Sequence, residues 1–113
     1  MLDTDTDIAF IQCYGAFFIM GHDISGYKKG EEIAYLRRSA FNDLNGTIYN
    51  ALNCNNFNAG CSGNGEEAEF TKEQLLTGLN YIGDKEEFEP ERQFLKDCIS
   101  NLDENDKVLI YFG

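Results

Sequence analysis

Residues 8–20, with the sequence IAFIQCYGAFFIM, constrain the fold of this chain most strongly. Apolar side chains occupy both alternating faces of this β-branched and aromatic-rich segment, which is typical of a central strand or of a buried hairpin pair. These residues, fully extended, would span roughly 43 Å at the usual strand rise, which is long for a small domain. We therefore expect a bend, a bulge or a turn near Tyr14 and Gly15.

The middle of the chain is predicted to contain a turn-rich loop, a helix and a second, longer loop. Residues 21–30 are predicted to form the first loop, and residues 31–52 the helix, because their apolar residues recur at spacings of three and four. That apolar stripe consists of Ile33, Leu36, Ala40, Phe41, Leu44, Ile48 and Leu52. Residues 53–69 are rich in Asn and Gly, so we expect a long irregular loop. Its length favours a role in recognition, and the alternative is a simple connection between two helices.

The last third of the chain carries clear signals of secondary structure. Thr71 and Gln74 have the spacing of a capping box, and Gly83 is placed to end the helix that begins there. A third helix is predicted over residues 85–102, with Pro90 in its first turn or between a short lead-in and the main body. A short buried strand closes the chain. The expected fold class is α+β, with a small sheet formed by the N-terminal strand or hairpin and the C-terminal strand, packed against about three helices.

A single domain spanning residues 1–113 is expected, because the chain shows neither a linker nor an internal repeat. No apolar run reaches the ~20 residues needed to cross a bilayer. The acidic residues Asp3, Asp5 and Asp7 stand where a secretory signal would carry positive charge. A cytoplasmic location with reduced cysteines is therefore expected.

Charge is the second strong feature of the sequence. Twenty acidic residues stand against nine basic ones, a formal net charge of −11, and residues 66–113 alone hold thirteen acidic and five basic side chains. A surface of this sign repels the phosphate backbone, so direct binding of nucleic acid is not expected. It would be attracted to basic surfaces, including the grooves with which other proteins hold DNA or RNA. The alternative is that the acidity only keeps a small protein soluble.

Few residues offer catalytic or metal-binding chemistry. His22, the single histidine, and Cys61 lie in different predicted loops, and an acidic environment disfavours a thiolate, so we expect no cysteine enzyme. Cys54 and Cys61 are separated by six residues, and His22 could complete a tetrahedral zinc site with them. Their spacing differs from that of zinc ribbons, and free loop thiols are the alternative. We therefore expect a protein without enzymatic activity, with zinc as its one candidate cofactor.

In size, acidity and lack of catalytic motifs, the chain resembles the small anti-CRISPR proteins of phages and mobile elements, in particular inhibitors of type II Cas9. The resemblance concerns general character along the whole chain and involves no alignable motif, so no residue role is carried over. It implies a phage-encoded inhibitor, acting in the host cytoplasm, whose acidic surface blocks nucleic-acid loading of a Cas9-like effector. The expected partner-binding surface comprises Asp84, Glu86, Glu87, Glu89, Glu91, Asp97, Asp103, Glu104 and Asp106.

Two other functions are open at this point. The first is a small zinc-stabilised domain, and the second is a cytosolic immunity or accessory protein whose acidity is incidental. Binding that weakens steeply with salt would favour the acidic inhibitor. Stoichiometric zinc that is lost on Cys54→Ser or Cys61→Ser would favour the zinc domain. A salt-insensitive and largely apolar interface would favour the accessory protein.

Overall fold

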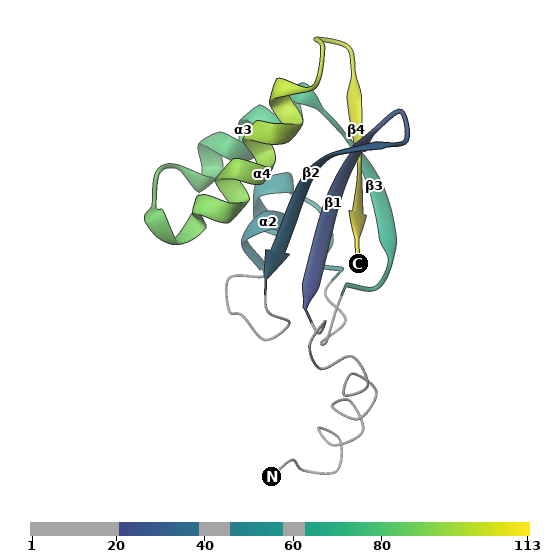
Figure 1. Cartoon of the computed structure of the whole chain (residues 1–113). Coiled ribbons are helices and arrows are strands. Elements are labelled where there is room, and N and C mark those ends of the chain that lie inside the picture. The colour runs from purple at the N-terminus through teal and green to yellow at the C-terminus, as the bar shows by residue number, and fades with distance from the viewer. Residues whose placement is uncertain (1–20, 39–45, 58–62) are drawn as a thin grey trace.

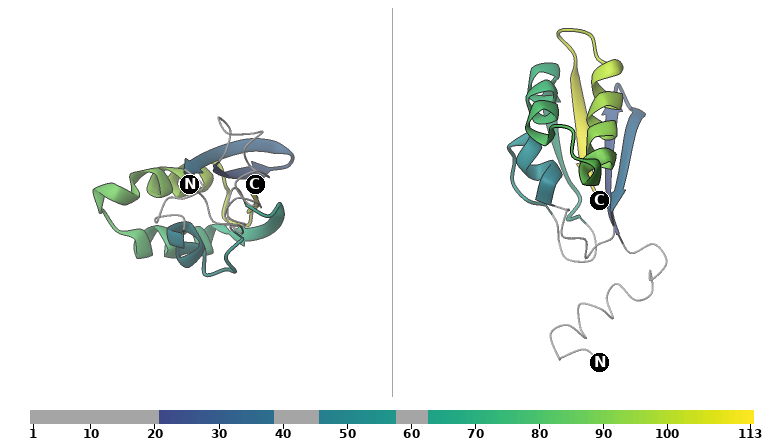
Figure 2. Two further views of the ribbon diagram at one scale, coloured as in Figure 1. Left: turned by 90° about the horizontal axis from the view of Figure 1, so that it is seen from below. Right: turned by 90° about the vertical axis from the view of Figure 1, so that its left-hand side faces the viewer.

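The computed structural model describes residues 21–38, 46–57 and 63–113. In these ranges four strands form one antiparallel sheet in the order β2-β1-β4-β3, and the α-helices lie along one of its faces (Figures 1 and 2). The α+β fold class is therefore confirmed, whereas the strand or hairpin predicted for residues 8–20 lies outside the described residues. The elements are β1 (His22–Lys28), β2 (Glu31–Arg38), α2 (Gly46–Leu52), β3 (Glu66–Thr71), α3 (Lys72–Ile82), the 3₁₀ turn η2 (Glu86–Phe88), α4 (Glu89–Ser100) and β4 (Lys107–Phe112).

The loop predicted for residues 21–30 and the long helix predicted for residues 31–52 are both wrong, because β1 and β2 form an antiparallel hairpin. Lys29 and Gly30 make the two-residue turn of this hairpin with φ angles of 52° and 83°. A type I′ turn requires such left-handed values at both positions, and its twist matches that of the flanking strands. The described remainder of the predicted helix is the short helix α2.

Burial along β2 alternates as expected for a strand with one solvated face. Ala34 and Leu36 are buried, whereas Tyr35 between them is exposed. Ile33 and Leu36 also stand three positions apart, so that a helical period fits the same residues. This double fit explains the incorrect helix.

Local signals in the last third of the chain are confirmed. The hydroxyl of Thr71 accepts a hydrogen bond from the Gln74 N–H at 3.2 Å, and the Gln74 side chain accepts one from the Thr71 N–H at 2.8 Å, which completes the predicted capping box. Helix α3 ends at Gly83, and Pro90 lies in the first turn of α4. The loop predicted for residues 53–69 ends earlier than expected, because β3 begins within that range.

Replacing Thr71 with alanine is expected to lower the free energy of unfolding by about 1 kcal/mol, because a first-turn amide of α3 loses its side-chain acceptor. Thr77→Ala is the matched control, since Thr77 is exposed on the same helix and alanine has the higher helix propensity. Urea denaturation of both variants checks this expectation. A cost of Thr71→Ala no larger than that of Thr77→Ala would contradict a stabilising role of the capping box.

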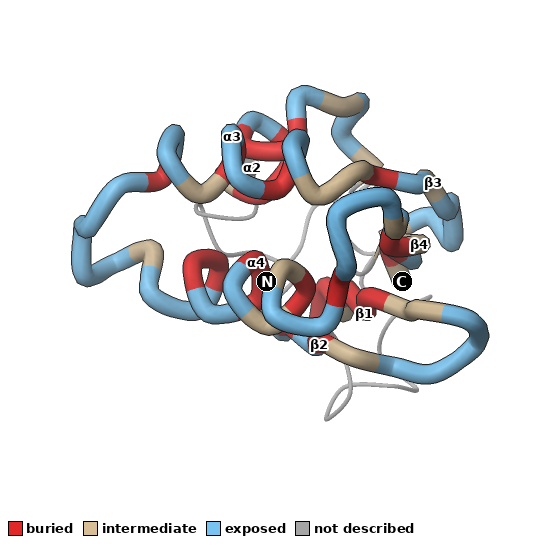
Figure 3. The backbone as a smooth tube through the Cα atoms, turned by 90° about the horizontal axis from the view of Figure 1, so that it is seen from above, coloured by how far each residue is buried: buried red, intermediate tan, exposed pale blue. Residues whose placement is uncertain are grey.

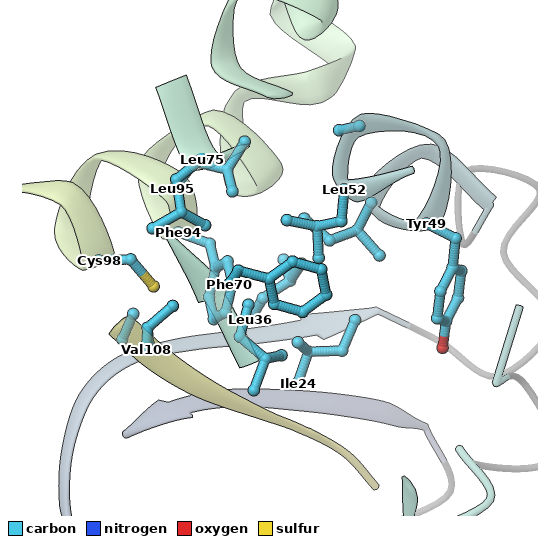
Figure 4. Close-up of a cluster of buried hydrophobic side chains, with 14 of the residues drawn as sticks. Ile24, Leu36, Tyr49, Leu52, Phe70, Leu75, Phe94, Leu95, Cys98 and Val108 are labelled. Carbon is cyan, nitrogen blue, oxygen red and sulfur yellow. The ribbon is translucent and has the colours of Figure 1, made fainter. Parts of the chain in front are cut away.

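The core lies between the helices and the inner face of the sheet (Figures 3 and 4). Gly26 of β1 permits α4 to approach closely, because a Cβ at this position would lie 2.9 Å from Sγ of Cys98. Cys98 is buried and packs as a small hydrophobic residue. None of the described helices is long and apolar enough to cross a membrane. The core side chains labelled in Figure 4 include Ile24, Leu36, Leu52, Phe70, Leu75, Phe94, Leu95 and Val108.

Candidate functional site

The acidic residues that were expected to form one partner-binding surface lie near opposite ends of α4. The helix has 12 residues, so its ends are about 18 Å apart at a rise of 1.5 Å per residue. The structure therefore offers two separate acidic regions in place of one continuous face. The group at the N-terminal end is Asp84, Glu86, Glu87 and Glu89, and the group at the C-terminal end is Asp97, Asp103, Glu104 and Asp106.

Glu91 is buried, so the prediction that it belongs to the partner-binding surface is wrong. Its side chain is 1% exposed and forms a bidentate ion pair with Arg38 of β2. Arg38 donates from Nε to Oε2 at 2.8 Å and from Nη2 to Oε1 at 2.7 Å. Glu91 is buried because it lies on the side of α4 that contacts β2. A buried carboxylate is tolerated only when it is paired and hydrogen-bonded.

Two of the four carboxylates at the C-terminal end of α4, those of Asp97 and Asp106, are engaged within the molecule. Asp106 pairs with Lys28 at 3.0 Å and accepts a hydrogen bond from the Asp103 N–H at 2.8 Å. This backbone hydrogen bond, followed by the contact with Lys28, lowers the pKa of Asp106. Asp97 accepts a hydrogen bond from Nε2 of Gln93 at 2.8 Å. These contacts fasten the connection between α4 and β4, which makes this end the weaker candidate for binding a partner.

The acidic turn, defined as residues 84–89 from the connection after α3 to the first residue of α4, is the stronger candidate. Asp84, Glu86 and Glu87 are exposed, and their carboxylates have no ion-pair or hydrogen-bond partner within the described part of the chain. Lys85 is the basic residue of the turn. The turn therefore presents a net negative charge to solvent.

Buried Arg92 holds the first half of the acidic turn. Its Nε donates to the carbonyl oxygen of Gly83 at 2.8 Å, and its Nη2 donates to the carbonyl oxygen of Lys85. Its Nη1 pairs with the carboxylate of Glu89, which precedes it by three residues in α4. The positive charge of Arg92 is thus compensated within the molecule. The carboxylates of Asp84, Glu86 and Glu87 remain exposed to solvent.

Arg38 holds the second half of the acidic turn. The same Nη2 that binds Glu91 also donates to the carbonyl oxygen of Glu87 at 2.8 Å. The turn is therefore fastened to β2 as well as to α4. A segment whose backbone is fixed before a partner arrives loses less conformational entropy on binding. The acidic turn consequently has the properties of a preorganised binding site.

His22 begins β1 and is buried, which corrects the expectation that it lies in a loop and completes a zinc site. Burial is the main cause of its lowered pKa, so the imidazole is neutral at pH 7. Its Nδ1–H donates to the carbonyl oxygen of Gly113 at 3.0 Å, and its Nε2 accepts a hydrogen bond from the hydroxyl of Tyr49. Both ring nitrogens are thus occupied, and neither is available to a metal.

Zinc binding by Cys54 and Cys61 stays a prediction. Cys54 is half-buried after α2, and burial raises the pKa of its thiol. The protonated form is thereby favoured over the thiolate that zinc binds. Cys61 lies outside the described residues. Across residues 21–38, 46–57 and 63–113, no three His, Cys, Asp or Glu side chains gather as a metal site requires.

The face of the sheet opposite the helices is a second candidate site, which the sequence did not predict. None of the described helices covers it, and it is called the open face below. Tyr35 of β2 and Tyr111 of β4 flank Ser25 of β1 in the strand register and are 52% and 39% exposed. Tyr27 and Leu109 form a neighbouring cross-strand pair on this face. Tyrosines of this kind, solvent-exposed on a rigid sheet, are common contact residues in protein interfaces. The alternation of apolar and polar residues along β2 was the sequence signal for this face. It was not recognised, because a helix was predicted for the same residues.

Comparisons with protein-family models, with curated proteins and with solved structures find no match for this chain.

Proposed function

We propose that this protein is a non-enzymatic acidic binding protein that docks on a basic, nucleic-acid-handling protein through the acidic turn. The outward carboxylates would occupy a groove that otherwise holds phosphates, so that docking inhibits the loading of nucleic acid. The observation that supports this most directly is the fastening of the turn by Arg38 and Arg92, whose guanidinium groups bind its backbone carbonyls from inside. The net charge of −11 adds long-range attraction to a basic partner.

The strength of such docking depends on several charges acting together. A single exposed ion pair contributes at most about 1 kcal/mol. Asp84, Glu86 and Glu87 lie within four consecutive positions on a fixed backbone, so their contributions combine without a large loss of entropy. We therefore expect an interaction that forms quickly at low ionic strength and weakens steeply with added salt.

A Cas9-like effector is the partner that the resemblance to small anti-CRISPR proteins suggests. Such effectors hold the guide–target heteroduplex in a positively charged channel and recognise it through its backbone. An acidic turn of fixed shape is suited to compete for that channel. In this reading the protein is encoded by a phage and acts in the host cytoplasm.

Charge reversal in the acidic turn tests the proposal. The double variant Glu86→Lys/Glu87→Lys is expected to weaken binding by at least about tenfold, because two attractive charges become repulsive. Affinity pull-down from nuclease-treated host lysate, at low and at high salt, identifies the partner by mass spectrometry. Competition between this protein and fluorescent target DNA for a purified Cas9-like effector with its guide then measures the inhibition.

Glu31→Lys/Glu32→Lys is the matched control, because both residues are exposed on the β1–β2 hairpin and the change in net charge is the same. Weakening confined to the variant in the acidic turn supports the proposal. Equal weakening in both double variants would show that affinity depends on the net charge of the protein and not on the acidic turn. A partner that has no basic surface and is retained at high salt would contradict an acidic inhibitor altogether.

A further inference from the structure

Strand β3 forms one edge of the four-stranded sheet in the described part of the chain (Figure 1). It pairs with β4 in an uninterrupted antiparallel register from Glu66↔Phe112 to Thr71↔Lys107. No other described strand lies beside it. In an antiparallel edge strand, every second residue directs its backbone N–H and C=O away from the sheet, where they can pair with a further strand.

The opposite edge of the sheet, formed by β2, is much less suited to pairing. The register between β1 and β2 shifts between Gly26 and Tyr27, which marks a β-bulge, and bulges disrupt the addition of a further strand. Of the two described edges, β3 is thus the regular one.

The side chains of β3 determine which kind of strand fits this edge. Glu66, Glu67 and Glu69 are exposed along the strand. A second copy of this chain would place carboxylates opposite carboxylates, which is destabilising, and a phosphate backbone would be repelled as well. Lysine or arginine opposite these positions would be stabilised. The charge of the edge therefore selects a basic strand from a different protein.

The open face of the sheet adds aromatic and apolar contacts beside these carboxylates. Glu67 is the cross-strand partner of Tyr111, and Glu69 is the cross-strand partner of Leu109. An added strand would lie about 4.8 Å from β3. A long basic side chain at its centre would cover Glu67 and extend toward the exposed ring of Tyr111, where a cation is attracted to the aromatic face.

We propose that β3 binds an extended segment of a partner protein by strand addition, and that this segment carries lysine or arginine at alternate positions. Main-chain hydrogen bonds provide the affinity, whereas Glu67, Glu69 and Tyr111 select the basic side chains. This edge lies across the molecule from the acidic turn (Figures 1 and 2). It is therefore a second surface, beyond the proposed function, and each surface is testable without the other.

Titration of the full-length, ¹⁵N-labelled protein with a capped peptide of alternating threonine and lysine tests this proposal. We expect chemical-shift changes at the β3 amides and slower hydrogen exchange at every second one of them. The same peptide with glutamate in place of lysine should produce neither. Glu67→Lys/Glu69→Lys is expected to weaken peptide binding by about tenfold. Glu86→Lys/Glu87→Lys carries the same change in net charge in the acidic turn and should leave peptide binding unchanged.

Several outcomes would overturn strand addition at β3. One is the absence of shifts at β3 up to the solubility limit of the peptide. Another is equal binding of the lysine and glutamate peptides, and a third is a loss of binding caused by the acidic-turn variant and not by the β3 variant. Protection of every β3 amide in the free protein would show that the edge is already occupied. A failure of the acidic-turn proposal leaves the chemical shifts and hydrogen exchange of β3 unaffected, because they need no natural partner and the acidic-turn variant serves only as a charge control.

Discussion

Glu91→Ala is expected to lower the free energy of unfolding by about 3 kcal/mol, because Arg38 would keep a largely buried guanidinium without its counter-charge. This value is at the low end for a broken buried pair, since the side chain of Arg38 is 17% exposed and water can solvate part of it. Arg38→Ala should cost at least as much, because Glu91 is more deeply buried and the carbonyl of Glu87 loses its donor. Urea denaturation at pH 7 measures both changes.

Glu87→Ala provides the control, four residues before Glu91. Glu87 is exposed and its carboxylate has no ion-pair partner in the described part of the chain, so its removal should cost at most about 0.5 kcal/mol. The combined variant Arg38→Met/Glu91→Leu should recover most of the lost stability, because neither charge is left buried alone. If Glu91→Ala and Glu87→Ala were equally mild, the buried pair would not contribute as its geometry indicates.

Features that depend on neighbouring residues were predictable from the sequence. The capping box joins Thr71 to Gln74, only three positions away, and Gly83 and Pro90 act through their own backbone restrictions. Such local signals do not depend on tertiary contacts. The C-terminal strand was also predictable, since a short run of β-branched and aromatic residues follows a polar turn.

The β1–β2 hairpin was not predictable in the same way. Its turn consists of Lys29 and Gly30, which lacks the Asn-Gly or Asp-Gly pair that marks most two-residue hairpins. Ile33 and Leu36 fit a helical period as well as a strand, and a short apolar pattern does not distinguish the two. What decides for the strand is pairing with β1 on one side and packing under α4, both of which are tertiary contacts.

The candidate sites show the same division between local and long-range information. Composition showed that the region around α4 is acidic, but it did not show which carboxylates are free. Glu91 is paired with a residue 53 positions away, and Asp106 is paired with Lys28 of the hairpin. Only the fold distinguishes these internal pairs from Asp84, Glu86 and Glu87. The preorganised character of the acidic turn likewise depends on arginines from two different elements.

Phe112→Ala is expected to lower the free energy of unfolding by about 3–5 kcal/mol, which is the usual cost of truncating a buried phenylalanine. Its side chain is fully buried at the end of β4. Its ring packs against those of Tyr49 and Phe57, with centroid distances of 5.3 and 5.0 Å. Truncation would therefore leave a cavity where β4, α2 and the segment after α2 meet, and the surrounding aromatic contacts would be lost together.

Tyr111→Ala is the control for this variant, because Tyr111 precedes Phe112 on the same strand and faces the opposite side of the sheet. Its truncation removes an exposed side chain and should cost at most about 1 kcal/mol, chiefly through lower strand propensity. Thermal and urea unfolding of both variants compare the two faces of one strand directly. If the two costs were similar, the register that places Phe112 inward and Tyr111 outward would be incorrect. The placement of Tyr111 beside Glu67 on the open face would then be incorrect as well.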